Sequence, residues 1–456
     1  MGGDLERDLG FVAVLTISMG AMIGSGVFVL PALGYKIAGN AVVVAYVLAG
    51  LVVLPAALSK AEMATAMPES GGTYIFIDRA MGPLVGTVAG IGAWFSLVFK
   101  SSFALVGLGA YLLLFVEIPA TLVKPIALAL GTAIVVLNVV GTKQSSQLQS
   151  VIVTAVVATL VGYVVNGSFL VEAARYRPFD VTGDGGVVTA AAFVFVSYAG
   201  VTKIASIAEE VENPGKNIPR GMLASMGIMM IVYTFVVAVV IGLNDPDTLI
   251  HGGPDGGPSL TPMADGAAAL FGGVGVTVIS LMAVLALTSM ANAGVLASSR
   301  FPLAMARDSL LPRRLAHVDR RFKTPSTAIA FTGGLLLVLI AFVPVVDLAK
   351  LASAFQILVF SLVNLALVAF RESDVPFYDP TFRTPGYPYV QIVGLVGGLV
   401  LLGQMGTIPL LGAAGIAMGG VVLYLAYGRS RTERRGALAT LFGDDDDGAV
   451  QPTGRE

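Results

Sequence analysis

The chain has no cysteine and only two histidines among its 456 residues. These absences exclude disulfide bonds, thiolate catalysis and cysteine-ligated metal sites. Charged residues are also scarce, at 12%, and the net charge of −2 does not supply the basic field needed to bind nucleic acid. The sequence contains no H-E-x-x-H or G-x-S-x-G motif and no paired aspartates in its apolar segments, so we expect neither an enzyme nor a bound cofactor.

Apolar sequence is what the chain has in abundance. Hydrophobic residues make up 56% of it and the mean hydropathy is +0.85, which is too apolar for a soluble globular protein. Segments near the roughly 20 apolar residues that a helical span requires recur throughout. We therefore predict an all-α integral membrane protein of about twelve transmembrane helices, near residues 10–33, 40–66, 83–116, 121–141, 147–170, 186–208, 219–243, 266–300, 325–346, 348–370, 388–408 and 410–428.

Lysine and arginine are distributed unevenly over the loops between these spans. With the N-terminus inside, 21 of the 27 lie on the cytoplasmic side, five lie in outer loops, and Lys100 lies within a span. This asymmetry predicts a multi-pass protein of the cell membrane, embedded in the lipid bilayer, with both termini in the cytoplasm. The transmembrane domain is expected to cover residues 1–435. Residues 436–456 carry Asp444 to Asp447 and no apolar periodicity, so we expect a disordered acidic cytoplasmic tail.

Two of the predicted spans are interrupted near their middles. The run from Gly20 to Gly26, G-A-M-I-G-S-G, puts three glycines and a serine into the first span, a poor composition for an unbroken helix. Ser197, Ala199 and Gly200 interrupt the sixth span in the same way. Interrupted segments at corresponding positions of two halves indicate a transporter site built on an inverted repeat. The alternative for Gly20 and Gly24 is a small-xxx-small helix-packing face.

A broken helix exposes backbone groups that suit an amino acid. Free N–H groups at the start of the outer half favour a carboxylate, and free carbonyls at the end of the inner half favour an ammonium group or a small cation. We expect the carboxylate site at Gly24, Ser25 and Gly26. The carbonyl acceptors are expected in the first span at Gly20, Ala21, Met22 and Ile23, and in the sixth span at Phe195, Val196 and Ser197.

Four ordered motifs resemble the amino acid-polyamine-organocation transporter family. They are S-M-G-A-M-I-G-S-G-V-F-V-L-P in the first span, E-M-A-T-A-M-P-E-S-G-G-T-Y from Glu62, E-E-V-E-N-P-G-K-N-I-P-R from Glu209, and A-M-A-R-D-S-L-L-P from Ala304. The resemblance implies a five-plus-five inverted repeat, with repeats near 10–170 and 186–370, followed by two further helices near 388–428. It also implies a permease that takes up or exchanges amino acids by alternating access, driven by an H⁺ or Na⁺ gradient or by exchange, as a monomer or a homodimer.

The resemblance also assigns roles at the two breaks. In the family the glycine-rich break holds the substrate carboxylate, which falls here on Gly24, Ser25 and Gly26, and an aromatic residue that closes over the substrate falls on Tyr198. Thr202 stands where arginine–agmatine exchangers carry an acidic residue, and Val196 replaces their aromatic platform. We therefore expect a neutral cargo of small to medium size. A cationic amino acid exchanger, a nutrient sensor and a channel are the alternatives.

The residues that couple transport to an ion are less defined. Sodium-coupled relatives of this fold use carbonyls of the first break and a hydroxyl pair in the eighth helix, which fall here on Gly20 and Ile23 and on Thr288 and Ser289. The pair could equally be ordinary small-residue packing. Lys100 lies midway along an apolar run, where a charge costs at least a few kcal/mol. It is either a proton-coupling residue or a lysine that lines a wet vestibule or contacts a carbonyl. Lys203 raises the same question, with snorkelling toward the cytoplasmic face as its alternative.

Overall fold

The first predicted span is divided into three helices in the computed structural model. The structure describes residues 9–67, 72–116, 119–141, 146–179, 186–253, 256–319, 321–373, 375–432 and 436–442. Helix α1 (Phe11–Met22) ends inside the glycine-rich run, α2 (Ser25–Phe28) follows after two residues, and α3 (Leu30–Ala38) completes the span. The predicted break in the first span is therefore confirmed.

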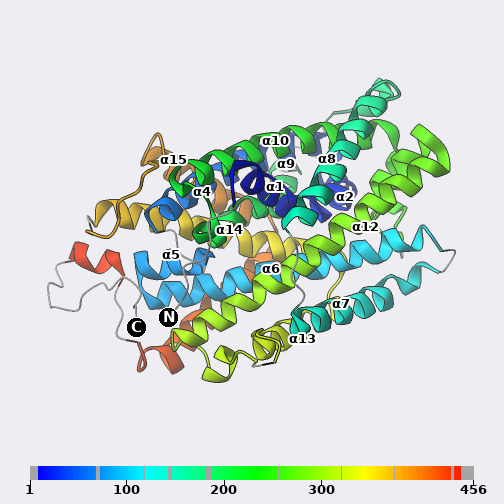
Figure 1. Cartoon of the computed structure of the whole chain (residues 1–456). Coiled ribbons are helices and arrows are strands. Elements are labelled where there is room, and N and C mark those ends of the chain that lie inside the picture. Colours follow the sequence, from blue (N-terminus) through cyan, green and yellow to red (C-terminus); the bar gives the residue numbers. More distant parts are fainter. Residues whose placement is uncertain are drawn as a thin grey trace.

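The remaining spans agree closely with the hydropathy pattern, and the described chain is almost entirely helical (Figure 1). Nine helices of the described residues are long and apolar enough to cross a membrane, and three shorter apolar helices accompany them. The helices after α3 are α4 (Val42–Ala66), α5 (Gly72–Met81), α6 (Pro83–Leu113), α7 (Val123–Val140), α8 (Ser146–Ser168), α9 (Gly186–Val194) with η4 (Phe195–Glu210), α10 (Pro214–Leu243), α11 (Pro246–His251), α12 (Pro262–Arg307), α13 (Ser326–Phe342), α14 (Val345–Glu372), α15 (Tyr389–Gly403) and α16 (Thr407–Leu423).

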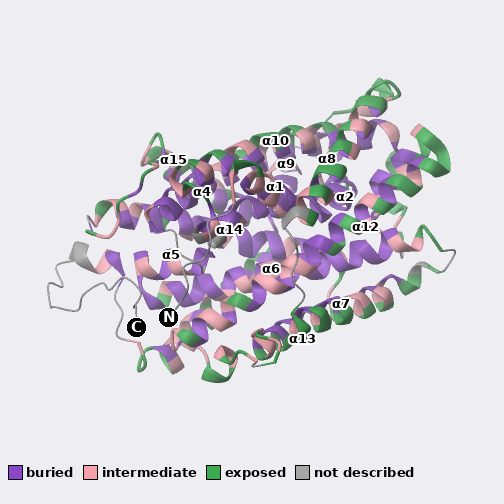
Figure 2. Cartoon of the chain, viewed as in Figure 1, coloured by how far each residue is buried: buried purple, intermediate pink, exposed green. Residues whose placement is uncertain are grey.

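Burial separates a central group of helices from a perimeter (Figure 2). In the most apolar stretch of α6, 78% of residues are buried inside the protein, against 17% in the segment Thr407–Gly428 that contains α16. The perimeter exposes large apolar side chains such as Val151 of α8, Phe342 of α13 and Leu411 of α16. Exposed apolar surface on this scale fits helices that face lipid, with α6, α9 and α14 in the interior.

Two features differ from the predicted spans. Helix α12 continues to Arg307, beyond the predicted end at residue 300, and is kinked at Phe271 and Gly272. The hydropathy pattern also omitted α5, because its 10 residues are too short to cross a bilayer. Helix α5 lies at the same end of the bundle as the C-terminal end of α12, since Tyr74 of α5 donates a hydrogen bond to Asp308 (2.7 Å). We call this the α5 end.

The first residues of the predicted tail are ordered rather than disordered. Ala437–Phe442 forms a short 3-10 helix (η8), and Ala437 is fully buried in the hydrophobic core. The burial of this alanine explains why the segment stays with the bundle. Asp444 to Asp447 lie outside the described residues.

Candidate substrate site

The break between α1 and α2 depends on the backbone conformation of two residues. Ile23 is extended (φ −64°, ψ 127°) and Gly24 adopts φ 157°, ψ −131°, which side chains disfavour. A Cβ atom at Gly24 would also overlap the sulfur of Met290. The glycine therefore both ends the helix and admits Met290 of α12 to the break.

The sixth span changes helix type instead of unwinding. Helix α9 ends at Val194, and η4 continues it as a 3-10 helix from Phe195, so the change precedes the predicted interruption at Ser197 to Gly200. Ser353 of α14 stabilises the junction, because its hydroxyl donates to the carbonyl of Phe193 (2.7 Å) and accepts the N–H of Val196 (3.2 Å). A 3-10 helix keeps most carbonyls bonded within the helix. Fewer carbonyls than expected are therefore free to accept from a cargo at Phe195 to Ser197. Among these three residues, the carbonyl of Ser197 accepts a hydrogen bond from a side chain, the hydroxyl of Tyr233 (3.4 Å).

The two interrupted helices cross in direct backbone contact. A Cβ atom at Gly200 would overlap the carbonyl of Ala21, and one at Gly26 would lie 2.7 Å from the Cβ of Ser197. Ala21 thus lies beside Gly200, and Gly26 lies beside Ser197, so residue numbers increase along one segment and decrease along the other. The two segments are therefore antiparallel, as the predicted inversion requires.

Three buried tyrosines close the crossing on the side of α2. The hydroxyl of Tyr46 donates to the carbonyl of Gly26 (2.7 Å), that of Tyr198 to the carbonyl of Tyr46 (3.0 Å), and that of Tyr233 to the carbonyl of Met22 (2.8 Å). The ring of Tyr233 packs edge-on against those of Tyr46 and Tyr198, with centroids 5.8 and 5.2 Å away. We call these three residues the tyrosine cap. Only Tyr198 was predicted from the sequence.

The predicted carboxylate site is occupied by a side chain of the protein itself. The backbone N–H of Ser25 donates to the thioether sulfur of Met290 (3.4 Å), and the Ser25 hydroxyl does so at 3.7 Å. A thioether is a weak acceptor, so this sulfur stands where the carboxylate oxygen of a ligand would be a better partner. Gly24, Ser25 and Gly26 are buried, and Met290 separates them from the cavity described next.

A cavity of about 580 Å³ leads from the crossing to the α5 end. At its deep end it is lined by Gly20 and Ala21 of α1 and by Gly200, Thr202 and Lys203 of η4. At the other end it is lined by Arg300 and Arg307 of α12, both of which are exposed. Its volume lies in the range of small-molecule sites and exceeds what one amino acid needs.

Lys100 of α6 lies at the deep end of this cavity. Its side chain is 6% exposed, and its Nζ donates to the carbonyl of Ala21 (3.4 Å) at the end of α1. Lys100 thus lines the cavity and contacts a carbonyl, and its role in proton coupling stays a prediction. Lys203 lines the same cavity and is half-buried.

The four residues expected to hold sodium are only partly brought together. Gly20, Ile23 and Ser289 line a second cavity of about 10 Å³, the size of one water molecule or small ion. Thr288 is exposed on another face of α12 and does not line this cavity. Gln149 of α8, which the sequence did not single out, takes its place, and its Oε1 accepts the hydroxyl hydrogen of Ser289 (2.8 Å).

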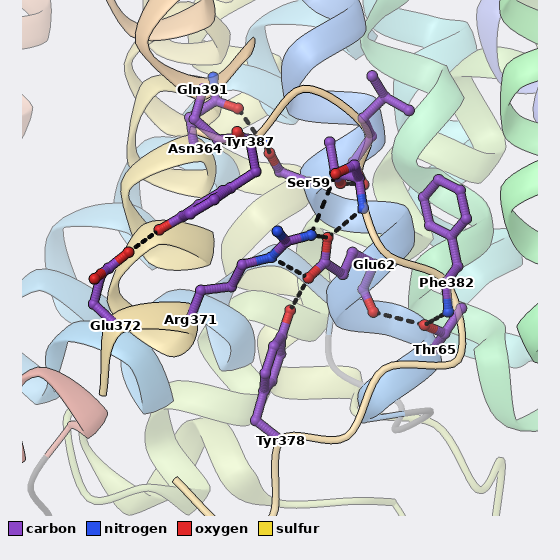
Figure 3. Close-up of polar contacts among 12 residues, drawn as sticks. Ser59, Glu62, Thr65, Asn364, Arg371, Glu372, Tyr378, Phe382, Tyr387 and Gln391 are labelled. Carbon is purple, nitrogen blue, oxygen red and sulfur yellow. Dashed lines mark hydrogen bonds and ion pairs between the residues drawn. The ribbon is translucent and has the colours of Figure 1, made fainter. Parts of the chain in front are cut away.

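A polar cluster at the α5 end joins α4, α14 and the loop that follows α14 (Figure 3). Glu62 is fully buried, and Arg371 donates to its Oε1 and Oε2 at 2.8 and 2.7 Å. The backbone N–H of Thr384 (2.6 Å) and the hydroxyl of Tyr378 (3.1 Å) also donate to this carboxylate. Burial, followed by the charge of Glu62, raises the pKa of Tyr378, which keeps its hydroxyl protonated as a donor. Glu62 is therefore a fully buried carboxylate held by four hydrogen bonds.

The chain is similar to known transporters over almost its whole length. The amino acid permease family matches residues 9–427. The branched-chain amino acid permease BcaP of Bacillus subtilis (strain 168) is 29% identical over 447 residues, 94% of each chain. The methylthioribose transporter of that strain is 29% identical over 85% of this chain and 86% of its own. The serine/threonine exchanger SteT of that strain is 25% identical over 88% of this chain and 91% of its own.

Proposed function

We propose that this chain, which belongs to the amino acid permease family, is a secondary active transporter that carries an amino acid across the cell membrane by alternating access. The observation that carries the proposal is the antiparallel crossing of two interrupted helices at the deep end of a cavity that reaches only the α5 end. Interrupted helices that cross at membrane depth place backbone groups where a cargo can bind. The cap of buried tyrosines separates this position from the opposite side.

We assign this arrangement to an inward-facing state. The α5 end carries the basic loops that the positive-inside rule assigns to the cytoplasm. In this state the sulfur of Met290 satisfies the N–H of Ser25. A cargo carboxylate would displace the sulfur, because a charged acceptor forms the stronger hydrogen bond. The carbonyls of Gly20 and Ile23 are the predicted acceptors left for the ammonium group, because those of Ala21 and Met22 accept from Lys100 and Tyr233.

The outward-facing state requires two changes at the crossing. The tyrosine cap must release the carbonyls of Gly26 and Met22, and the cavity at the α5 end must close. The three hydroxyl-to-carbonyl bonds of the cap are local and are exchanged for water contacts at modest cost, about 0.5–1.5 kcal/mol each. They therefore suit a gate that opens and closes repeatedly.

The names of the relatives indicate different cargoes: branched-chain amino acids, methylthioribose, and serine or threonine. Membership of the family therefore supports a small cargo of this general type, and the cargo itself has to be measured. We propose a proton gradient or exchange as the driving force. The 10 Å³ cavity holds only part of the predicted sodium ligand set, because Thr288 is exposed and lies outside it, which makes it a poor sodium site.

Uptake into proteoliposomes tests the proposal. The purified full-length chain should concentrate at least one of the twenty radiolabelled amino acids inside vesicles under an imposed inward proton gradient, or exchange it against a preloaded amino acid. Uptake should be unchanged when choline replaces sodium. Equilibration without concentration or exchange would indicate a channel, and binding without movement would indicate a sensor. If uptake is lost when choline replaces sodium, transport depends on sodium and the small cavity is again a candidate sodium site.

A further inference from the structure

The cavity at the α5 end contains more cations than its own carboxylates can neutralise. The described residues that line it include five basic side chains, Lys60, Lys100, Lys203, Arg300 and Arg307, and two acidic ones, Glu210 and Asp308. Asp308 is already engaged by the hydroxyl of Tyr74. Basic groups that exceed acidic groups by three, in a cleft with low-dielectric walls, favour small anions over small cations.

Lys100 and Lys203 are the two cations at the deep end, beside the helix crossing. Lys100 is almost fully buried, yet its recorded hydrogen bond, to the carbonyl of Ala21, is longer than the usual 2.7–3.2 Å. In the described part of the chain neither lysine has a carboxylate within ion-pair distance. The charge of Lys203 also repels Lys100 on one side and Arg300 on the other.

An unpaired cation at this depth is costly, and an anionic ligand would offset the cost. Removing a lysine from water without a counter-charge costs several kcal/mol, whereas a charge-assisted hydrogen bond to a carboxylate is among the strong ones. Gln356 lines the same cavity, and its Oε1 accepts the hydroxyl hydrogen of Ser96, which leaves its amide N–H groups as further donors. Gln356 therefore adds donors to those of Lys100 and Lys203.

The α-carboxylate of a cargo does not satisfy both the helix break and Lys100. Lys100 contacts the carbonyl of Ala21, in the inner half of the interrupted helix, whereas the N–H of Ser25 begins the outer half, beyond the extended Ile23 and Gly24. A cargo with two carboxylates can place one at the Ser25 N–H and the other at Lys100, one on each side of the break. A cargo with a cationic side chain would instead bring a sixth positive charge among the five.

We propose that Lys100 and Lys203 form a carboxylate subsite, so that the preferred cargo is an amino acid with a second carboxylate and not the neutral amino acid expected from the sequence. The inference rests on the proposed transport function and names its substrate class. The same subsite disfavours lysine and arginine as cargo. Lys100 provides the buried contact, and Lys203 extends the subsite toward the α5 end.

Binding to the purified full-length chain in detergent tests the subsite. The ligands are glutamate, its neutral isostere glutamine, glutarate, which has two carboxylates and no ammonium group, and lysine. We expect glutamate to bind about tenfold or more tighter than glutamine, as one charge-assisted hydrogen bond predicts. In Lys100→Gln and in Lys203→Gln this ratio should fall toward one while glutamine affinity is retained. Lys36→Gln, which removes a positive charge from an exposed position on α3, should keep the ratio of the parent.

The remaining outcomes distinguish the carboxylate subsite from the proposed amino acid transport. Equal affinity for glutamate and glutamine in the parent, or a ratio that survives both lysine substitutions, overturns the subsite and leaves amino acid transport standing. Glutarate that binds as tightly as glutamate, and loses affinity in Lys100→Gln, supports the subsite and contradicts an amino acid as cargo. Preferential binding of lysine overturns the subsite. Because Lys203 is only half-buried, Lys203→Gln gives a result even if Lys100→Gln does not fold.

Discussion

Gly200 is the residue at which the backbones of the two interrupted helices come closest. A Cβ atom there would overlap both the carbonyl carbon and the carbonyl oxygen of Ala21, which are backbone atoms that no side-chain rotation can move. A methyl group must therefore push α1 and η4 apart. The crossing, and the placement of the Ser25 N–H relative to η4, depend on the absence of this one side chain.

We predict that Gly200→Ala reduces amino acid uptake in proteoliposomes by at least about tenfold, a loss of about 1.4 kcal/mol or more in transition-state or binding free energy. Gly227→Ala is the matched control, because Gly227 also lies in a helix and a Cβ atom there meets nothing within 4 Å. Uptake by Gly200→Ala at the level of Gly227→Ala would show that the crossing tolerates separation and is not the cargo site.

Some residues of the crossing could be predicted from the sequence, and others could not. The composition of the run from Gly20 to Gly26 predicted the first break because glycine and serine weaken a helix locally. Met290, Gln149 and Tyr233 could not be predicted, since each reaches the crossing from a helix distant in sequence. Their local sequences resemble ordinary packing residues, and only the tertiary contacts assign them a position.

At the level of helices, the cluster around Glu62 fixes the α5 end. It ties α4 to α14 and to the loop after α14 through four hydrogen bonds to one buried carboxylate. A neighbouring chain of polar contacts, from Gln391 of α15 through Ser59 of α4 to Asn364 of α14, joins the same helices (Figure 3). The relative position of α4, α14 and α15 is thus set by polar contacts as well as by apolar packing.

Glu62→Gln should lower the stability of the purified protein markedly. Removing one partner of a buried ion pair costs about 3–5 kcal/mol, because the charge of Arg371 is left without compensation. The measurement is the midpoint of thermal unfolding in detergent. Glu372→Gln is the control, since Glu372 is exposed and bonds only to the hydroxyl of Tyr387 in the described structure. A midpoint for Glu62→Gln equal to that of the control would contradict a stabilising role for the cluster.

The helices themselves were largely predictable, with two instructive exceptions. Long apolar segments stand out because each must meet the thickness of the bilayer. Helix α5 carries no such signal at 10 residues. The 3-10 geometry of η4 could not be predicted from the local sequence either. It depends on the hydroxyl of Ser353, more than 150 positions away, which hydrogen-bonds to the backbone at the junction.

At the level of the whole molecule, orientation in the membrane follows from charge. The loops at the α5 end carry most of the lysine and arginine residues, whereas the loop around α11 at the opposite end carries aspartates. The inward-facing interpretation of the cavity depends on this orientation, because the cavity opens at the α5 end. If the orientation were reversed, the same structure would represent an outward-facing state.

The absence of cysteine makes the orientation directly measurable. We predict that a membrane-impermeant maleimide added to intact cells labels Asp247→Cys, in α11, and does not label Arg313→Cys, in the loop after α12, because the positive-inside rule places these exposed positions on opposite sides. The parent chain, which has no thiol, should remain unlabelled, and permeabilised cells should label both variants. Labelling of Arg313→Cys alone in intact cells would reverse the orientation. The cavity with its five cations would then face the outside, and Lys100 and Lys203 would meet the cargo on entry instead of on release.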